Sequence, residues 1–154
     1  MADQVPSDFD ETRKTIKALI REHQCQFAPN KAVGWVWGYS VQKDKQAFSV
    51  YQRSGRPDAL FISLSADISD YNHLIESLPP KDRDELLFDV RFALLACDVE
   101  FDIPNNALRD SILLTRQLFV EDGITRTVFW DKVFAIHKGT LAIVWTIERR
   151  IPLQ

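Results

Sequence analysis

The chain has 154 residues, of which 45% are hydrophobic and 27% are charged, as in an ordinary globular protein. A domain usually takes roughly 100–200 residues, so we expect a single domain over residues 1–154. The 19 Lys and Arg against 22 Asp and Glu give a formal charge of −3, which argues against nucleic acid as a partner, because such binding depends on neutralising phosphates.

We expect no targeting or membrane segment in this sequence. Residues Met1–Glu11 are polar and acidic, unlike the basic and then apolar start of a secretory signal. The most hydrophobic stretch, Gly139–Ile147, is far shorter than the roughly 20 residues that cross a bilayer. Two cysteines, Cys25 and Cys97, do not make a disulfide framework. We therefore expect a cytoplasmic protein with free thiols and no membrane partner.

The hydrophobic pattern changes its period several times along the chain and predicts eight main elements. In chain order they are a helix over Asp8–Gln26, strands near Val33–Ser40, Ala47–Tyr51 and Leu60–Ser65, a helix over Pro80–Ala96, strands near Val99–Ile103 and Ser111–Val120, and a helix from Thr125 to Arg150. A short helical turn is also expected before Leu78. Short connections join antiparallel neighbours. The predicted fold class is therefore α+β, with an antiparallel five-stranded sheet, helices on one face, and the order α-β-β-β-α-β-β-α.

Alternate side chains of a strand point to opposite faces, which divides the predicted sheet into two sets. The large apolar set is expected in the core and includes Trp35, Trp37, Phe48, Ile62 and Leu114. The other set, on the solvated face, includes Ser49, Ser63 and Thr115. Three aromatic residues lie among these small and polar side chains, and we predict that they bind a protein or peptide partner: Tyr51, Phe61 and Phe119.

The helix over Pro80–Ala96 carries more apolar residues than one face requires. If the stripe Leu87/Val90/Leu94 faces the sheet, a second surface is left for a homodimer. The predicted dimer-interface residues are Leu86, Phe88, Phe92 and Leu95. The alternative is that a neighbouring helix of the same chain covers the second side, and the sequence does not decide which stripe faces inward.

No established catalytic or cofactor motif occurs in the sequence, and no cofactor is expected. The residues that could ligate a metal lack the paired spacing of zinc sites. They are His23, Cys25, His73, Cys97 and His137. We therefore predict no metal site. Another possible carboxylate cluster, Asp98, Glu100 and Asp102, is interpreted as a solvated strand edge, where charge discourages pairing with other strands.

Two parts of the sequence carry a resemblance to known proteins. They are Phe119–Arg126, followed by Trp145-Thr146-Ile147, and Pro79–Asp82, leading into Leu87–Arg91. From about Asp8 to Arg150 the chain resembles a family of small prokaryotic proteins of unassigned function, and its element order resembles the fold of type III secretion chaperones. This resemblance implies a homodimer through the middle helix and an extended partner segment held on the sheet or in grooves. It transfers no catalytic motif.

Three functions remain open from the sequence. The first is a non-enzymatic, homodimeric, chaperone-like module that binds a protein or peptide through the open sheet face or a helix–sheet groove. The second is an enzyme or small-molecule-binding protein with an unrecognised pocket. The third is a regulatory subunit that is stable only within a larger complex. Ionisable residues converging in a deep cleft favour an enzyme, and a flat apolar patch favours the interaction module.

Overall fold

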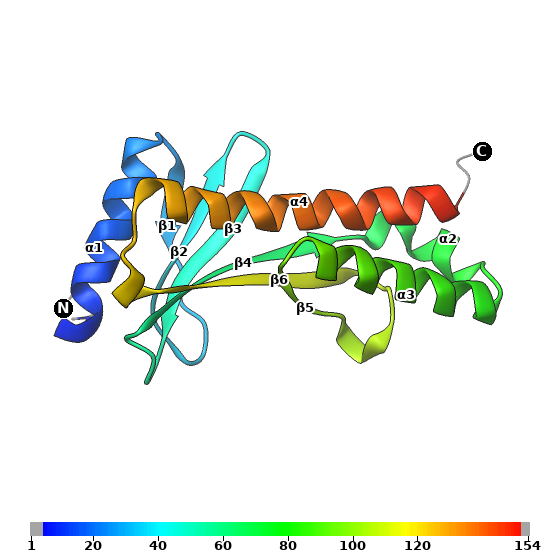
Figure 1. The fold of residues 1–154 in the computed structure, drawn as a ribbon, viewed down its shortest axis with the longest axis horizontal. Helices are drawn as coiled ribbons and strands as arrows, with labels where there is room; N and C mark the ends of the chain where they lie inside the picture. Colours follow the sequence, from blue (N-terminus) through cyan, green and yellow to red (C-terminus); the bar gives the residue numbers. More distant parts are fainter. Residues whose placement is uncertain (1–4, 152–154) are drawn as a thin grey trace. The chain divides into compact units, whose positions relative to one another are not determined.

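The structure is a computed structural model that describes residues 5–151, and these divide into two compact units. Unit 1 comprises residues 5–63 and Arg116–Val133, and unit 2 comprises Leu64–Thr115 and residues 134–151. Strand β4 (Ala59–Asp67), strand β6 (Ser111–Phe119) and helix α4 (Arg126–Arg150) contribute residues to both units. The α+β class is confirmed (Figure 1), and the single domain stays a prediction.

The antiparallel sheet has six strands, in the order β1-β2-β3-β4-β6-β5, so the prediction of five was wrong. The missed strand, β1 (Gln26–Pro29), occupies the place where the sequence predicted the end of the first helix. Helix α1 (Ser7–Glu22) ends earlier, and Gln24 reverses the chain with a φ of 56°. Four residues are too few for a periodic signal. The strand exists because its backbone pairs with β2 (Trp35–Lys43), for example Phe27 with Val41.

The core of unit 1 lies on the face of the sheet that the large apolar residues share. The ring of Phe48, on β3 (Gln46–Arg53), meets the rings of Phe129 and Trp130 on α4. Residues of α1, β2, β3 and β4 complete this core: Phe9, Ile16, Ile20, Trp37, Tyr39, Val50, Leu60 and Ile62. A buried Gln52 also lies here, and its amide oxygen accepts a hydrogen bond of 2.7 Å from the Trp37 indole. Its amide nitrogen donates to the Ala59 carbonyl at 3.2 Å, so this buried polar group is satisfied.

The opposite face of the sheet in unit 1 is covered by the protein's own Trp35. The register of β2 on β3 shifts between Trp35 and Trp37, and this irregularity puts Trp35 on the face opposite to Trp37. Its indole stacks on the Tyr51 ring, with centroids 3.9 Å apart, and Tyr51 in turn stacks on Phe61. The Arg53 guanidinium lies 4.6 Å from the centroid of Phe61. An aromatic stack capped by a cation therefore closes this face.

Several expectations for the two faces are corrected by this stack. Tyr51 and Phe61 are almost fully buried rather than exposed, so the surface predicted for them is not open. Ser63 is also buried, because its hydroxyl is hydrogen-bonded to the Tyr51 hydroxyl at 2.8 Å. Trp35, predicted in the core, is half-buried on the opposite face. The core positions of Phe48, Ile62 and Leu114 are confirmed, and Ser49 and Thr115 are half-buried.

Unit 2 is built around helix α3 (Pro80–Ala96) and the C-terminal part of α4 (Figure 1). Its remaining elements are the short helices η1 (Ser69–Tyr71), α2 (Asn72–Glu76) and η2 (Pro104–Asn106) and strand β5 (Glu100–Asp102), while η3 (Val120–Asp122) belongs to unit 1. Gly139 lets α4 approach its neighbours closely. A Cβ at this position would lie 3.1 Å from Leu114 Cδ1 on β6 and 3.6 Å from Leu94 Cδ2 on α3.

Gly38→Ala is expected to destabilise unit 1. The added Cβ would lie 2.7 Å from both the Asn30 carbonyl oxygen and the Trp35 ring, so the backbone or the aromatic stack must move. Such overpacking costs about 1–3 kcal/mol of unfolding free energy, which urea denaturation measures. Gln42→Ala, at an exposed site on the same strand, is the control and should stay close to wild type. Equal stability of the two variants would contradict the close packing around Gly38.

Candidate interaction surface

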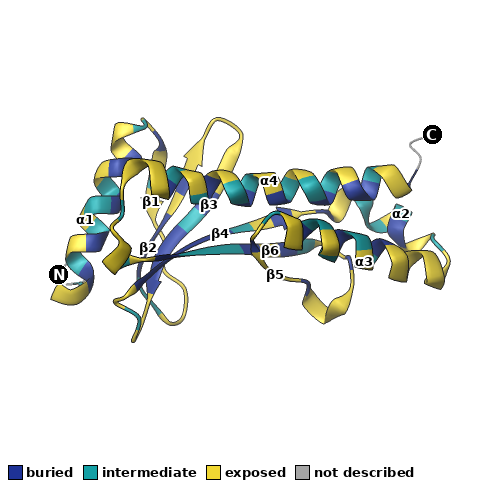
Figure 2. Ribbon diagram, viewed as in Figure 1, coloured by how far each residue is buried: buried dark blue, intermediate teal, exposed yellow. Residues whose placement is uncertain are grey.

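Helix α3 has two apolar rows, and only one of them is buried. Leu86, Val90 and Leu94 lie at successive turns and are fully buried within unit 2. Phe88, Phe92 and Leu95 each expose 67% of their surface, and the rings of Phe88 and Phe92 stack with centroids 6.3 Å apart. Figure 2 shows how the exposed side of α3 runs along the helix. A neighbouring helix of the described chain therefore does not cover the second row.

The predicted interface set on α3 needs one correction. Leu86 is a core residue, and Leu87, which was placed in the inward stripe, is half-buried instead. The predicted inward stripe and the observed buried row differ by one residue position, Leu87 against Leu86, and successive side chains on a helix are about 100° apart at about 3.6 residues per turn. Sequence periodicity alone left both stripes possible. The described structure exposes Phe88, Phe92 and Leu95, while their role in a dimer stays a prediction.

A second exposed apolar row lies on α4 in unit 2, and sequence reasoning missed it. Phe134, Leu141 and Trp145 expose 64%, 49% and 61% of their surfaces. On the other side of this helix Ile136, Ile143 and Ile147 are buried. A signal was available, since large apolar residues at positions 134, 141 and 145 lie opposite to the inward stripe.

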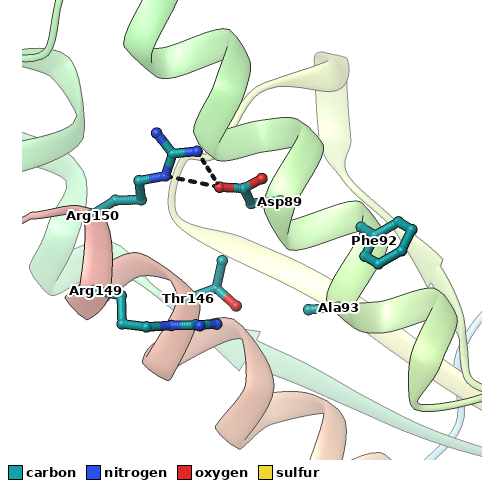
Figure 3. A pocket seen from close by; sticks show the side chains of 6 residues that line it. All are labelled: Asp89, Phe92, Ala93, Thr146, Arg149 and Arg150. Atoms are coloured by element: carbon teal, nitrogen blue, oxygen red, sulfur yellow. Dashed lines mark hydrogen bonds and ion pairs between the residues drawn. The ribbon is translucent and has the colours of Figure 1, made fainter.

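A hollow of about 440 Å³ lies between α3 and α4 in unit 2 (Figure 3). Its lining combines apolar and charged side chains: Asp89, Phe92, Ala93, Thr146, Arg149 and Arg150. The Arg150 guanidinium is held by Asp89 at 2.6 Å and by Glu85 at 3.2 Å. These two carboxylates raise the pKa of Arg150. The carboxylate of Asp89 is therefore already paired, whereas the Arg149 guanidinium has no ion-pair partner among the described residues.

The end of α4 is also fixed on its other side. The Tyr71 hydroxyl donates a hydrogen bond of 2.7 Å to a Glu148 carboxylate oxygen. Glu148 raises the pKa of Tyr71 through this bond. Together with the Arg150 contacts, this interaction anchors the last two turns of α4 within unit 2. The exposed row of α4 is thus presented on a helix that is held firmly at its end.

Among the three aromatic residues predicted for the sheet surface, only Phe119 is exposed, at 46%. It lies at the end of β6 in unit 1, whereas Tyr51 and Phe61 are covered. The structure therefore does not bring the three together on an open surface. Their role in binding a partner remains a prediction, and the sheet face that carries Tyr51 and Phe61 is covered by Trp35.

The candidate metal ligands are dispersed. Within residues 5–151, no three His, Cys, Asp or Glu side chains are arranged to hold a metal ion. Burial raises the pKa of the Cys25 thiol and lowers the pKa of the His137 imidazole. The His23 ring packs on the Trp130 ring, with centroids 4.4 Å apart. None of the helices in the described part of the chain is long and apolar enough to cross a membrane.

The fold and the exposed rows define this protein as an α+β chain with apolar surface on two of its helices. The chain belongs to a family described as uncharacterized conserved protein (DUF2299), whose model matches residues 12–147. The unassigned function expected from the resemblance agrees with this family. No curated protein matches the chain.

Two solved structures share the fold. A crystal structure of an uncharacterized protein from Methanothermobacter thermautotrophicus has a TM-score of 0.81 and 23% identity, over 91% of this chain and 99% of that one. YbjN from E. coli, provisionally assigned as a transcription regulator, has a TM-score of 0.53 and 11% identity, over 92% of this chain and 96% of that one. At these identities both likenesses concern the fold alone.

The two rows of α3 should respond differently to the same substitution. Leu86→Ala removes a fully buried side chain and should lower the unfolding free energy by about 2–5 kcal/mol. Leu95→Ala, at an exposed position, should lower it by less than about 0.5 kcal/mol. Urea melts at the lowest workable protein concentration compare the two, so that any association of chains contributes least. A larger loss for Leu95→Ala would mean that the rows are assigned the wrong way round.

Protein purified without chelator should contain well under one zinc per chain by elemental analysis. The physical reason is the scatter of His23, Cys25, His73, Cys97 and His137, which does not provide the four ligands of a structural site. A stoichiometric metal that survives dialysis would contradict this expectation.

Proposed function

We propose that this protein is a non-enzymatic protein-interaction module that works as a homodimer, with the exposed row of α3 forming the contact between the two copies. The observation that carries the proposal is the 67% exposure of Phe88, Phe92 and Leu95 on one side of a helix whose other side is buried. Large apolar side chains gathered on one surface mark interaction sites more often than isolated ones do.

The size of this row suits an interface. An aromatic side chain buries about 150–250 Å², so two Phe and one Leu exposed by two-thirds offer roughly 300–450 Å² of apolar area. Interfaces are about 60% apolar, which scales this to roughly 500–750 Å² per copy. A standard interface buries about 800 Å² per partner. A two-fold arrangement brings the same row of each copy together and therefore needs no second surface.

The chaperone-like aspect of the proposal concerns how a further partner is held. In unit 1 the predicted open sheet face is closed by Trp35, which argues for the helices of unit 2 as the partner-binding elements. The YbjN likeness does not transfer a role in transcription, because it concerns the fold alone. This chain has no established catalytic motif, which is consistent with an interaction module. Such a module needs no cofactor.

Static light scattering tests the homodimer. The wild type should have twice the chain mass of 17.8 kDa at micromolar concentration. Phe92→Asp should give the mass of one chain, because a carboxylate at the interface is desolvated without a partner. Since Phe92 is exposed within one chain, the variant should keep its helical circular dichroism.

Phe119→Asp is the matched control, because it makes the same change at an exposed residue of unit 1. It should leave the mass at two chains. A wild type that stays at 17.8 kDa as its concentration rises would reject the homodimer. If Phe119→Asp dissociates the dimer and Phe92→Asp does not, the interface lies on the sheet and not on α3.

A further inference from the structure

A second hollow, of about 230 Å³, is lined by residues of unit 1. Helix α1 packs beside β1 and β2 in this unit (Figure 1). The walls of the hollow come from α1, from β2 and from the segments that precede α1 and follow β1. The apolar part of the lining consists of Val5, Pro29, Val36, Trp37 and Tyr39. We call this site the α1–β2 hollow.

The wall on β2 is held in place by hydrogen bonds. The Trp37 indole N–H donates to the amide oxygen of Gln52 at 2.7 Å. The backbone N–H of Asn30 donates to the Gly38 carbonyl at 2.9 Å, which fixes the segment after β1 against β2. The α1–β2 hollow is therefore formed without a ligand, as most small-molecule sites are.

One polar group of this wall has no partner in the described part of the chain. Tyr39 exposes only 6% of its surface, and its ring packs edge-on against the Phe27 ring, with centroids 5.4 Å apart. Its hydroxyl forms no hydrogen bond with another described residue. Native proteins pair nearly all of their buried polar groups, so this hydroxyl indicates a bound water or ligand that accepts a hydrogen bond.

The charge around the α1–β2 hollow favours an anion. Among the described residues of its lining, the charged ones are the cations Arg13 and Lys31. The Asp10 carboxylate accepts a hydrogen bond of 2.8 Å from Arg13 and lies 2.9 Å from the Lys14 ammonium, so one carboxylate serves two cations. The contact with Asp10 uses one guanidinium nitrogen of Arg13, and a guanidinium carries five N–H donors in all.

The other acidic residues close to Arg13 in the sequence lie on the opposite side of α1. Asp8 and Glu11 are exposed, and around the helix they are about 140° and about 160° from Arg13, at about 100° per residue. Lys17, one turn after Arg13, adds another positive charge on the side that carries Arg13. The acidic residues of α1 therefore do not cancel the positive charge of this side.

We propose that the α1–β2 hollow binds a small organic anion, namely a monocarboxylic acid with an apolar body. The body packs on Val36 and Trp37, while the carboxylate accepts hydrogen bonds from the Arg13 guanidinium and the Tyr39 hydroxyl. A volume of about 230 Å³ lies below the roughly 300–1,000 Å³ of sites for drug-sized ligands, so the ligand is small. This inference goes beyond the interaction module and does not rest on it, because the residues of the proposed dimer contact belong to unit 2.

Isothermal titration calorimetry with phenylacetate and phenylacetamide tests the inference. The two probes share a ring and are nearly equal in size, but only phenylacetate is an anion. The wild type should bind phenylacetate with a dissociation constant of about 1 mM or below, and at least about tenfold more tightly than the amide. Isovalerate, an acid with a branched aliphatic body, extends the measurement to an anion without a ring.

Three variants assign the binding to the α1–β2 hollow. Arg13→Gln should weaken phenylacetate binding at least about tenfold and leave the amide unchanged. Arg83→Gln makes the same change at an exposed position of unit 2 and should keep the wild-type affinity. Tyr39→Phe should weaken phenylacetate binding about three- to tenfold. Because the Tyr39 hydroxyl has no partner among the described residues, this variant should keep the urea midpoint of the wild type, which separates a lost ligand contact from a damaged fold.

Four outcomes would overturn the proposal. Equal binding of phenylacetate and phenylacetamide would mean that the hollow selects shape and not charge. Wild-type affinity in Arg13→Gln would place the bound acid elsewhere on the chain. If neither phenylacetate nor isovalerate binds, the hollow is not a site for small acids. If instead a peptide that ends in Phe with a free carboxylate binds, the hollow holds a protein terminus. Light scattering of the wild type and Phe92→Asp measures the homodimer separately, so failure of either idea is recognised independently.

Discussion

The helical repeat of α3 decides what unit 2 exposes. Leu86, Val90 and Leu94 are buried, and at about 3.6 residues per turn this commits Phe88, Phe92 and Leu95 to the other side of the helix. No rotation of α3 hides both rows against one sheet. The exposure of the second apolar row is thus a consequence of helix geometry.

In unit 1, by contrast, the chain itself covers the apolar side chains on both faces of the sheet. Its sheet has apolar side chains on both faces, but a shift of register between Trp35 and Trp37 sends one indole to each face. Trp37 joins the core, where its N–H is satisfied by Gln52, while Trp35 covers Tyr51 and Phe61. Gly38 makes room for the Trp35 ring. A sheet face that would have been open for a partner is therefore closed from within.

Helix α4 has a buried side and an exposed side in unit 2. Gly139 allows close approach to Leu114 and Leu94, and the contacts of Glu148 and Arg150 anchor the end of the helix. Its exposed side carries Phe134, Leu141 and Trp145. The packing of the buried side thus decides which apolar residues of α4 stay exposed.

The sequence by itself determined the α+β class, the existence and approximate bounds of the long helices, and the apolar excess of α3. These features are local, because hydrophobic periodicity and turn residues within one segment carry them. Only the tertiary structure decided that β1 is a strand, that Leu86 rather than Leu87 is fully buried, and that Tyr51 and Phe61 are covered. Each of these depends on a partner distant in the chain: the β2 backbone for β1, the core of unit 2 for Leu86, and Trp35 for the two aromatic rings. Alternation within a strand assumes an unbroken register, and one shift beside Trp35 reverses its face.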